Sequence, residues 1–288
     1  MTDFLALVVN PDLPFLRYAL LAGILASAAF GVVGSLVVVK RISYIAGAIS
    51  HAALGGIGAA LYLQYHFGWS FMTPITGALL SALLAGGIIS FVNLRFKQRE
   101  DTIIGIIWAV GMATGLLFLS RTPGYTDPMS YLFGNILIIG QNDLWMILIL
   151  DVVVVAAAIL FYNQFLAVSF DENFARVRGM RTGFYQGLLI IMTALTVVLM
   201  TTLVGIVMVI ALLTIPAAVA GLLTRRLKFM MLAAALACLL FTTTGLAVSY
   251  IWDAPSGAVI ILVASAGYLL VLAFSQTQKL LRARRRSV

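Results

Sequence analysis

The sequence predicts an all-α polytopic membrane protein with about nine (eight to nine) transmembrane helices. Hydrophobic residues make up 62% of the 288 residues, charged residues only 10%, and the mean hydropathy is +1.10. The apolar residues run in stretches of about 20, the length that an α-helix needs to cross roughly 30 Å of hydrocarbon. A soluble domain of this size would carry about 25% charged residues. We therefore expect residues 1–288 to form a single transmembrane domain.

Nine apolar segments follow one another along the chain, with boundaries set by polar and turn-forming residues. The run 183–223 is continuous, so it forms either two spans with a tight turn near residues 203–205 or one long bent helix. The expected spans are residues 14–39, 44–64, 71–94, 102–120, 143–165, 183–203, 204–223, 229–251 and 257–276.

The connections expected on the outer side are turns rather than charged loops. Residues 65–69 are aromatic, 121–128 are rich in turn-forming residues, and 252–257 form another tight turn. Residues 129–140 are apolar but too short to cross the membrane, which favours a re-entrant or interfacial helix.

The basic residues predict the orientation of the chain. Of the 18 Lys and Arg residues, all except Arg17 and Arg121 fall in cytoplasmic connections or in the tail if the N-terminus is outside. This bias predicts an odd number of spans, an N-out/C-in topology and a basic cytoplasmic tail at residues 279–288. The net charge of +8 lies in short clusters between spans, a distribution that does not indicate binding to nucleic acid.

His51 is the most informative polar residue because it lies in an uncharged, glycine-rich stretch at residues 43–58. Read as a helix, Gly47, His51, Gly55 and Gly58 share one face, and small residues let membrane helices approach closely. The imidazole would then point into a helix–helix interface or a pore. An ionisable group at membrane depth is a candidate functional residue, and neutral imidazole binds transition metals. The alternative is a histidine that hydrogen-bonds a neighbouring helix.

Asp151 lies inside an apolar run, eight residues after Asp143. A carboxylate at that depth needs a partner or water. It could line a cation path as a second metal contact, but a structural hydrogen-bonding role is the favoured interpretation.

A polar segment, residues 169–180, interrupts the apolar runs on the cytoplasmic side. Asp171 suits an N-cap, Glu172 the first helical turn and Gly179 a C-terminal stop. The segment therefore predicts a short amphipathic helix at about residues 170–180 along the inner membrane face. It is either an ordinary loop helix or a docking element for a cytoplasmic partner.

The sequence lacks the motifs of an enzyme or an ATP-binding protein. It contains no P-loop motif, no HExxH zinc motif and no GxSxG nucleophile motif with a suitably placed histidine. With two histidines and few carboxylates, the chain is expected to be a channel, a secondary carrier or the membrane half of an ATP-driven machine.

Several stretches together resemble the membrane permeases of the bacterial ABC importers for zinc, manganese or iron. No single stretch is diagnostic, but they occur in the expected order over nearly the whole chain. They are KRISY at 40–44, AISHA at 48–52, DTIIGI at 101–106, YLFGNIL at 131–137, DENFARVRG at 171–179, LLTIPAA at 212–218 and DAPSG at 253–257.

This resemblance implies a multi-pass, type II ABC importer-like permease in the bacterial inner membrane. It implies a homodimer, two cytoplasmic ATP-binding subunits that hydrolyse ATP, an extracytoplasmic metal-binding protein, and no permanently bound cofactor. The short polar helix would be the coupling helix on which the ATPase subunits dock. Its candidate coupling residues are Asp171, Glu172, Phe174, Ala175, Arg176 and Gly179.

The resemblance also implies that His51 contacts the metal in the translocation path or its gate. In many of these permeases an aspartate precedes the histidine by four residues, whereas Gly47 occupies that position here. Loss of an oxygen ligand tilts the expected preference towards Zn²⁺, with manganese or iron next. Two alternatives stay open: a proton-coupled secondary metal-ion carrier that uses His51 and Asp151 as a relay, and an ABC permease for a metal-chelate complex.

Overall fold

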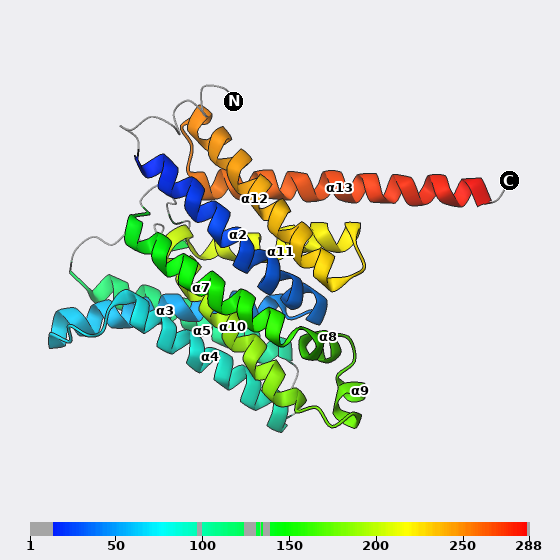
Figure 1. Ribbon diagram of the computed structural model, residues 1–288. Helices are drawn as coiled ribbons and strands as arrows, with labels where there is room; N and C mark the ends of the chain where they lie inside the picture. The colour runs from blue at the N-terminus through cyan, green and yellow to red at the C-terminus, as the bar shows by residue number, and fades with distance from the viewer. Residues whose placement is uncertain (1–13, 97–99, 124–130, 133, 135–138, 287–288) are drawn as a thin grey trace.

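The computed structural model describes residues 14–96, 100–123, 131–132, 134 and 139–286 (Figure 1). Within these ranges the named regular elements are all α-helices. They are α2 (Pro14–Lys40), α3 (Ser43–Phe67), α4 (Pro74–Phe96), α5 (Glu100–Arg121), α7 (Gln141–Leu160), α8 (Tyr162–Phe170), α9 (Glu172–Val177), α10 (Thr182–Val204), α11 (Ile206–Leu223), α12 (Leu227–Trp252) and α13 (Ser256–Arg286).

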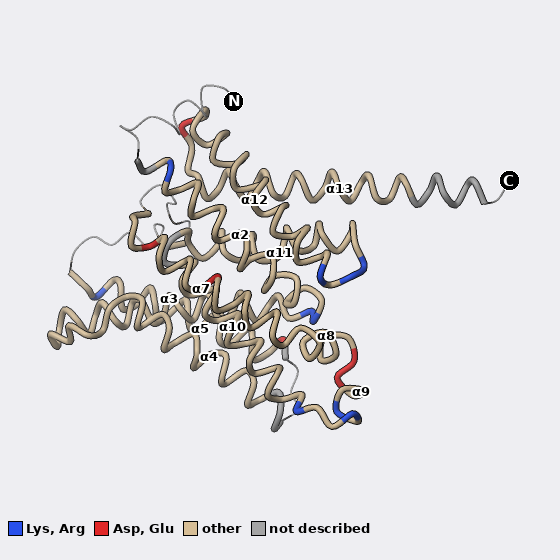
Figure 2. Tube along the Cα trace, viewed as in Figure 1, with Lys and Arg blue, Asp and Glu red and all other residues tan. Residues whose placement is uncertain are grey.

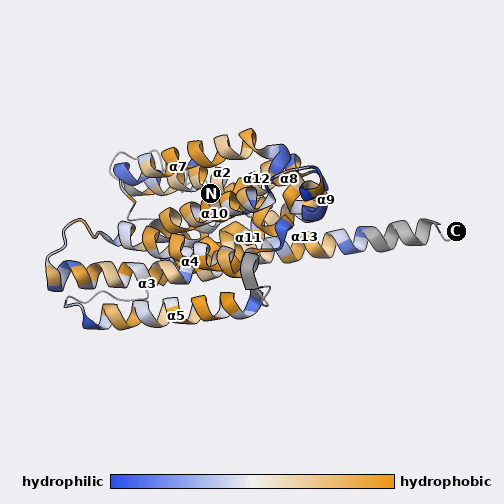
Figure 3. Ribbon diagram, turned by 90° about the horizontal axis from the view of Figure 1, so that it is seen from below, coloured by the Kyte–Doolittle hydropathy of each residue, from blue (hydrophilic) through white to orange (hydrophobic). Residues whose placement is uncertain are grey.

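Nine of the described helices are long and apolar enough to cross a membrane, which confirms the predicted all-α polytopic class and favours nine spans over eight. They are α2 to α5, α7 and α10 to α13, whereas α8 and α9 are too short. Apolar residues cover the helix flanks, and polar residues gather near the helix ends (Figure 3). Large side chains such as Leu84, Ile159 and Leu270 are exposed on these flanks, as expected for surfaces that face lipid.

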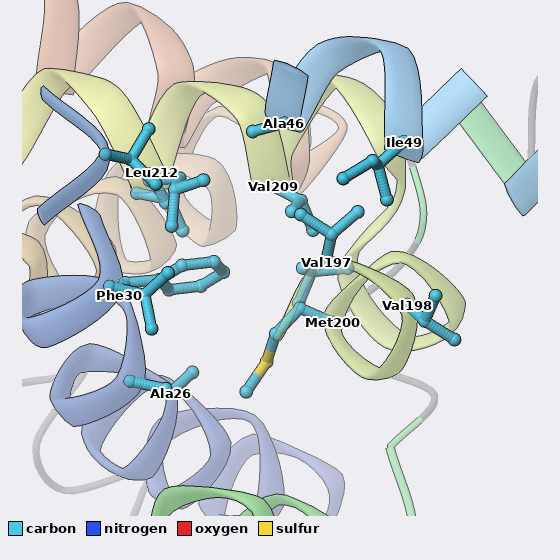
Figure 4. Close-up of a cluster of buried hydrophobic side chains, with 14 of the residues drawn as sticks. Ala26, Phe30, Ala46, Ile49, Val197, Val198, Met200, Val209 and Leu212 are labelled. Atoms are coloured by element: carbon cyan, nitrogen blue, oxygen red, sulfur yellow. The ribbon is translucent and has the colours of Figure 1, made fainter. Parts of the chain in front are cut away.

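The core forms where α2, α3, α10 and α11 meet. Figure 4 shows Phe30 of α2 facing Leu212 of α11, with Met200 of α10 beside them. Helix α3 is the most enclosed candidate span, because 83% of the residues in an apolar stretch of 18 are buried. It packs between α4 and α5, while α2 packs against α7, α11 and α12. The helix that carries His51 is therefore shielded on several sides by protein.

The apolar run 183–223 divides into two spans, which is one of the two arrangements that the sequence predicts. Helix α10 ends at Val204 and α11 begins at Ile206. The residue between them, Gly205, has a φ of 87° and a ψ of 156°, a conformation that strongly favours glycine. One backbone position therefore ends the first span and starts the second.

The expected span 143–165 is wrong at its C-terminal end, because α7 stops at Leu160 and the chain turns at Phe161 into α8. The 20 residues of α7 already cover about 30 Å at 1.5 Å per residue, and polar Asn163 and Gln164 follow.

Helix α13 is longer than the expected span: it continues past residue 276 to Arg286 and extends beyond the bundle (Figure 1). The expected re-entrant helix at residues 129–140 falls mostly outside the described residues.

The charge distribution agrees with the predicted orientation. Basic residues at the α2–α3 turn, at the α11–α12 turn and around α9 lie at the same end of the bundle (Figure 2). An odd number of spans also places the start of α2 and the end of α13 on opposite sides of the membrane. We call the basic end cytoplasmic.

Candidate functional site

The glycine stripe of α3 packs against α5, as the sequence predicts for a helix–helix interface. A Cβ added at Gly58 would lie 2.6 Å from the carbonyl oxygen of Gly115, and one at Gly55 would lie 3.0 Å from that of Gly111. Distances this short leave no room for a side chain, so the two backbones approach as closely as glycine allows. This packing fixes the depth and rotation of α3 around His51.

His51 lies in this interface and is only 7% exposed. Its imidazole stacks on the indole of Trp108 from α5, with ring centroids 4.4 Å apart and an angle of 23° between the planes. Its Nδ1 atom is buried and has no hydrogen-bond partner. A buried imidazole nitrogen without a partner is a candidate ligand for a cation.

Gly47 provides the space that Trp108 fills. A Cβ at position 47 would collide with the six-membered ring of the Trp108 indole. The side chain beside His51 on this face therefore comes from the neighbouring helix and is aromatic. Among the described residues, no group of three or more His, Cys, Asp or Glu side chains could hold a metal ion. The arrangement around His51 suits a transient contact better than a tight site.

Asp151 lies on α7 and is 6% exposed. Its Oδ1 atom accepts a hydrogen bond of 3.2 Å from the backbone N–H of Ala29 on α2, and its Oδ2 atom has no partner. Because α7 packs against α2 and α10 while α3 packs between α4 and α5, the structure places Asp151 and His51 in different helix contacts. The hydrogen bond to α2 supports the structural interpretation of Asp151.

Helix α9 has the local structure that the sequence predicts for residues 170–180. Asp171 is its N-cap, and Oδ1 of Asp171 accepts a 2.9 Å hydrogen bond from the N–H of Phe174. The helix ends in a Schellman motif: the N–H of Gly179 donates to the carbonyl of Arg176, and the N–H of Met180 donates to that of Ala175. Gly179 has a φ of 79°, which explains its place as the stop.

The side chains of α9 divide into a buried anchor and an exposed face. Ala175 is fully buried, whereas Phe174 is 52% and Val177 is 87% exposed. The guanidinium of Arg178 lies over the Phe174 ring, 4.8 Å from its centroid. Two exposed apolar side chains with a cation beside them, at the basic end of the bundle, make a small surface suited to docking another protein.

An ion-pair network that no local sequence pattern predicts connects α9 to the end of α2. Nζ of Lys40 donates to the carbonyl oxygen of Val168 at 2.9 Å and to Oε2 of Glu172 at 3.1 Å. Nη2 of Arg176 donates to the other carboxylate oxygen of Glu172, also at 3.1 Å. The sequence places Lys40 in the basic cytoplasmic cluster and in the KRISY stretch, and neither feature predicts a contact with Glu172.

Comparison with known proteins assigns the chain to a family. The model of the ABC 3 transport family matches residues 12–275. The chain belongs to the ABC 3 transport family. The match covers α2 to α12, most of the α13 span and both candidate regions, the His51 interface and α9, so these features belong to an ABC 3 permease.

Individual relatives align with this ABC 3 permease over almost its full length. A Synechocystis membrane protein, slr2045, is 42% identical over 93% of this chain and 94% of its own. The manganese transport system membrane protein MntC of Listeria monocytogenes is 34% identical over 95% of each chain. The structure of PsaBC from Streptococcus pneumoniae in complex with Fab matches with a TM-score of 0.82 and 29% identity, over 94% of both chains. The chain is thus a multi-pass membrane permease rather than an enzyme.

Proposed function

We propose that this permease is the membrane subunit of an ATP-driven importer that moves a divalent metal ion, manganese first, across the inner membrane. The observation that carries the proposal is His51, a buried imidazole on the most enclosed span, with an Nδ1 atom that no protein group satisfies. A polar atom without a partner at membrane depth costs free energy, and coordination of a passing cation by Nδ1 would offset that cost.

We propose manganese rather than zinc as the main transported ion because of the names of the related proteins. The expectation of zinc rests on the absence of a carboxylate at Gly47, whereas the Listeria monocytogenes relative is named for manganese. Backbone carbonyls and water can supply the oxygen ligands that Mn²⁺ favours. Zinc and iron are the competing ions to be tested beside it.

The permease would work as a homodimer with two cytoplasmic ATP-binding subunits and an extracytoplasmic metal-binding protein. Two copies would let two His51 side chains act near a shared path, which compensates for the few ligands in one copy. The exposed face of α9, with Phe174 and Val177, would receive the ATPase subunit. The proposed coupling residues are Asp171, Glu172, Phe174, Ala175, Arg176 and Gly179.

Reconstitution in proteoliposomes tests this function. Radioactive Mn²⁺ uptake should require the permease, its ATPase subunit, the loaded binding protein and ATP, and an uncoupler should leave it unchanged. Uptake by the permease alone that collapses with an uncoupler would instead indicate the proton-coupled carrier. Competition by unlabelled free Mn²⁺, but not by chelated metal, would separate a bare-ion permease from one for metal chelates.

A further inference from the structure

Lys40 is the last residue of α2, and its ammonium group reaches two parts of the α8–α9 segment. It donates to the carbonyl oxygen of Val168, in the last turn of α8, and to the carboxylate of Glu172, in the first turn of α9. Its side chain is 14% exposed, whereas that of Arg176, the other partner of Glu172, is 64% exposed. The Lys40 contact is therefore the more enclosed of the two ion pairs, and it joins residues 132 positions apart in the sequence.

The turn that follows Lys40 is short and well ordered. The N–H of Arg41 donates to the carbonyl of Val38, and the N–H of Ile42 donates to that of Val37, which together form a Schellman motif. Arg41 has a φ of 62°, and Ile42 is buried in the core. Helix α3 begins at the next residue, Ser43. A single hydrogen-bonded turn therefore joins the end of α2 to the start of α3.

The same helix carries His51, which lies about 12 Å along α3 from its first residue at 1.5 Å per residue. A continuous line of contacts thus runs from α9 through Glu172 and Lys40, around the α2–α3 turn, to the interface of His51 with Trp108. Each link is either a hydrogen bond or a rigid helix, the kind of connection through which two sites can be coupled.

We propose that Lys40 is a positioning residue that transmits movement of α9 to the α2–α3 pair and so links ATPase docking to the state of the His51 interface. The inference rests on the proposed function, in which α9 receives the ATPase subunit. It assigns Lys40 a role in coupling rather than in metal binding. If Lys40 only held the fold together, its loss would lower stability without changing the ratio of metal transported to ATP hydrolysed.

The test is Lys40→Met, which keeps the length of the apolar stem but removes the charge and both hydrogen bonds. The variant is reconstituted with the ATPase subunit and the Mn²⁺-loaded binding protein, and metal uptake per ATP is measured. We expect normal assembly and basal ATP hydrolysis, with metal uptake per ATP reduced about five-fold or more, the lower end of typical coupling effects.

Arg41→Met is the matched control, because it removes a positive charge from the same turn at an exposed side chain that is not a partner of Glu172. It should keep the wild-type ratio. Glu172→Gln retains the shape of the side chain and, like Lys40→Met, should lower the amount of metal transported per ATP. It is the second test variant if Lys40→Met does not assemble. If an assembled Lys40→Met complex transports as much metal per ATP as wild type, the proposal is overturned. If Lys40→Met does not assemble, a wild-type ratio of metal to ATP in Glu172→Gln overturns it instead. An inactive wild-type complex would contradict the proposed function instead.

Discussion

The imidazole of His51 and the indole of Trp108 stack at a centroid distance of 4.4 Å across the α3–α5 interface. The stack orients His51, the buried one of the two histidines, while Nδ1 of His51 has no hydrogen-bond partner. A ring held by stacking keeps its in-plane nitrogen atoms available for other ligands. Trp108 thus orients His51 as a hydrogen bond does in many metal sites.

Replacement of Trp108 should therefore affect both stability and transport. Trp108→Ala removes a stack worth about 0.5–1.5 kcal/mol beyond its buried area and leaves a cavity, so we expect a total loss of about 3–5 kcal/mol. Thermal unfolding in detergent measures this loss, and the KM for Mn²⁺ uptake should rise as the imidazole loses its orientation. Trp108→Phe retains a ring over His51 and should keep most of both properties. Equal KM values in wild type and Trp108→Ala would show that the stack does not orient the site.

Gly47→Ala should destabilise the protein because its methyl group would collide with the Trp108 ring. We expect a loss of about 1–3 kcal/mol, typical of overpacking, in thermal or denaturant unfolding. Gly87→Ala is the matched control in another membrane span, since a Cβ there would meet nothing within 4 Å. The loss should shrink in the double variant Gly47→Ala/Trp108→Ala. A full, additive loss in the double variant would mean that the strain lies elsewhere.

Asp151→Asn should be nearly neutral. The amide oxygen of asparagine can still accept the hydrogen bond from the N–H of Ala29. Asp151→Ala removes the hydrogen bond between α7 and α2, but the N–H of Ala29 keeps its acceptor within α2. The variant should therefore lose only about 0.5–1.5 kcal/mol of unfolding free energy. If Asp151→Asn folded normally but abolished Mn²⁺ uptake, the carboxylate would belong to the cation path and the structural interpretation would be wrong.

Phe174→Ala should weaken binding of the ATPase subunit to α9. Phe174 is 52% exposed at the cytoplasmic end, so its removal does not disturb the core but takes away apolar contact area. Truncation of a residue that contributes strongly to an interface costs more than about 1 kcal/mol, and a loss of about 1.4 kcal/mol is a ten-fold weaker affinity. Titration of the ATPase subunit onto nanodisc-embedded permease measures the change. Phe71→Ala is the control, because it removes an even more exposed ring (68%) at the opposite end, and it should bind the ATPase subunit normally. Equal affinities in both variants would remove Phe174 from the docking surface.

The sequence predicted most of the helices because their signals are local. Hydropathy marked nine spans, Gly205 provided the break between α10 and α11, and Asp171 and Gly179 set the ends of α9. Each of these depends on residues adjacent in the chain. The turn at Phe161 was missed because the apolar stretch resumes at Phe165 after only two strongly polar residues, Asn163 and Gln164, so hydropathy alone does not divide α7 from α8.

The contacts around the candidate site depend on tertiary packing and were not predictable in the same way. The glycine stripe indicated that His51 faces an interface, but not that Trp108 would come from α5 to fill the space beside Gly47. The contact of Lys40 with Glu172 joins distant parts of the chain, and no local pattern identifies such a pair.

The most direct test of the central claim is Mn²⁺ uptake by His51→Ala in the reconstituted complex. His66→Ala is the matched control, because it removes the only other histidine, which is exposed at the outer end of α3. We predict that His51→Ala assembles with its ATPase subunit but loses most metal uptake, while His66→Ala transports like wild type. Wild-type uptake kinetics in a correctly assembled His51→Ala complex would contradict the account and reduce His51 to a packing residue.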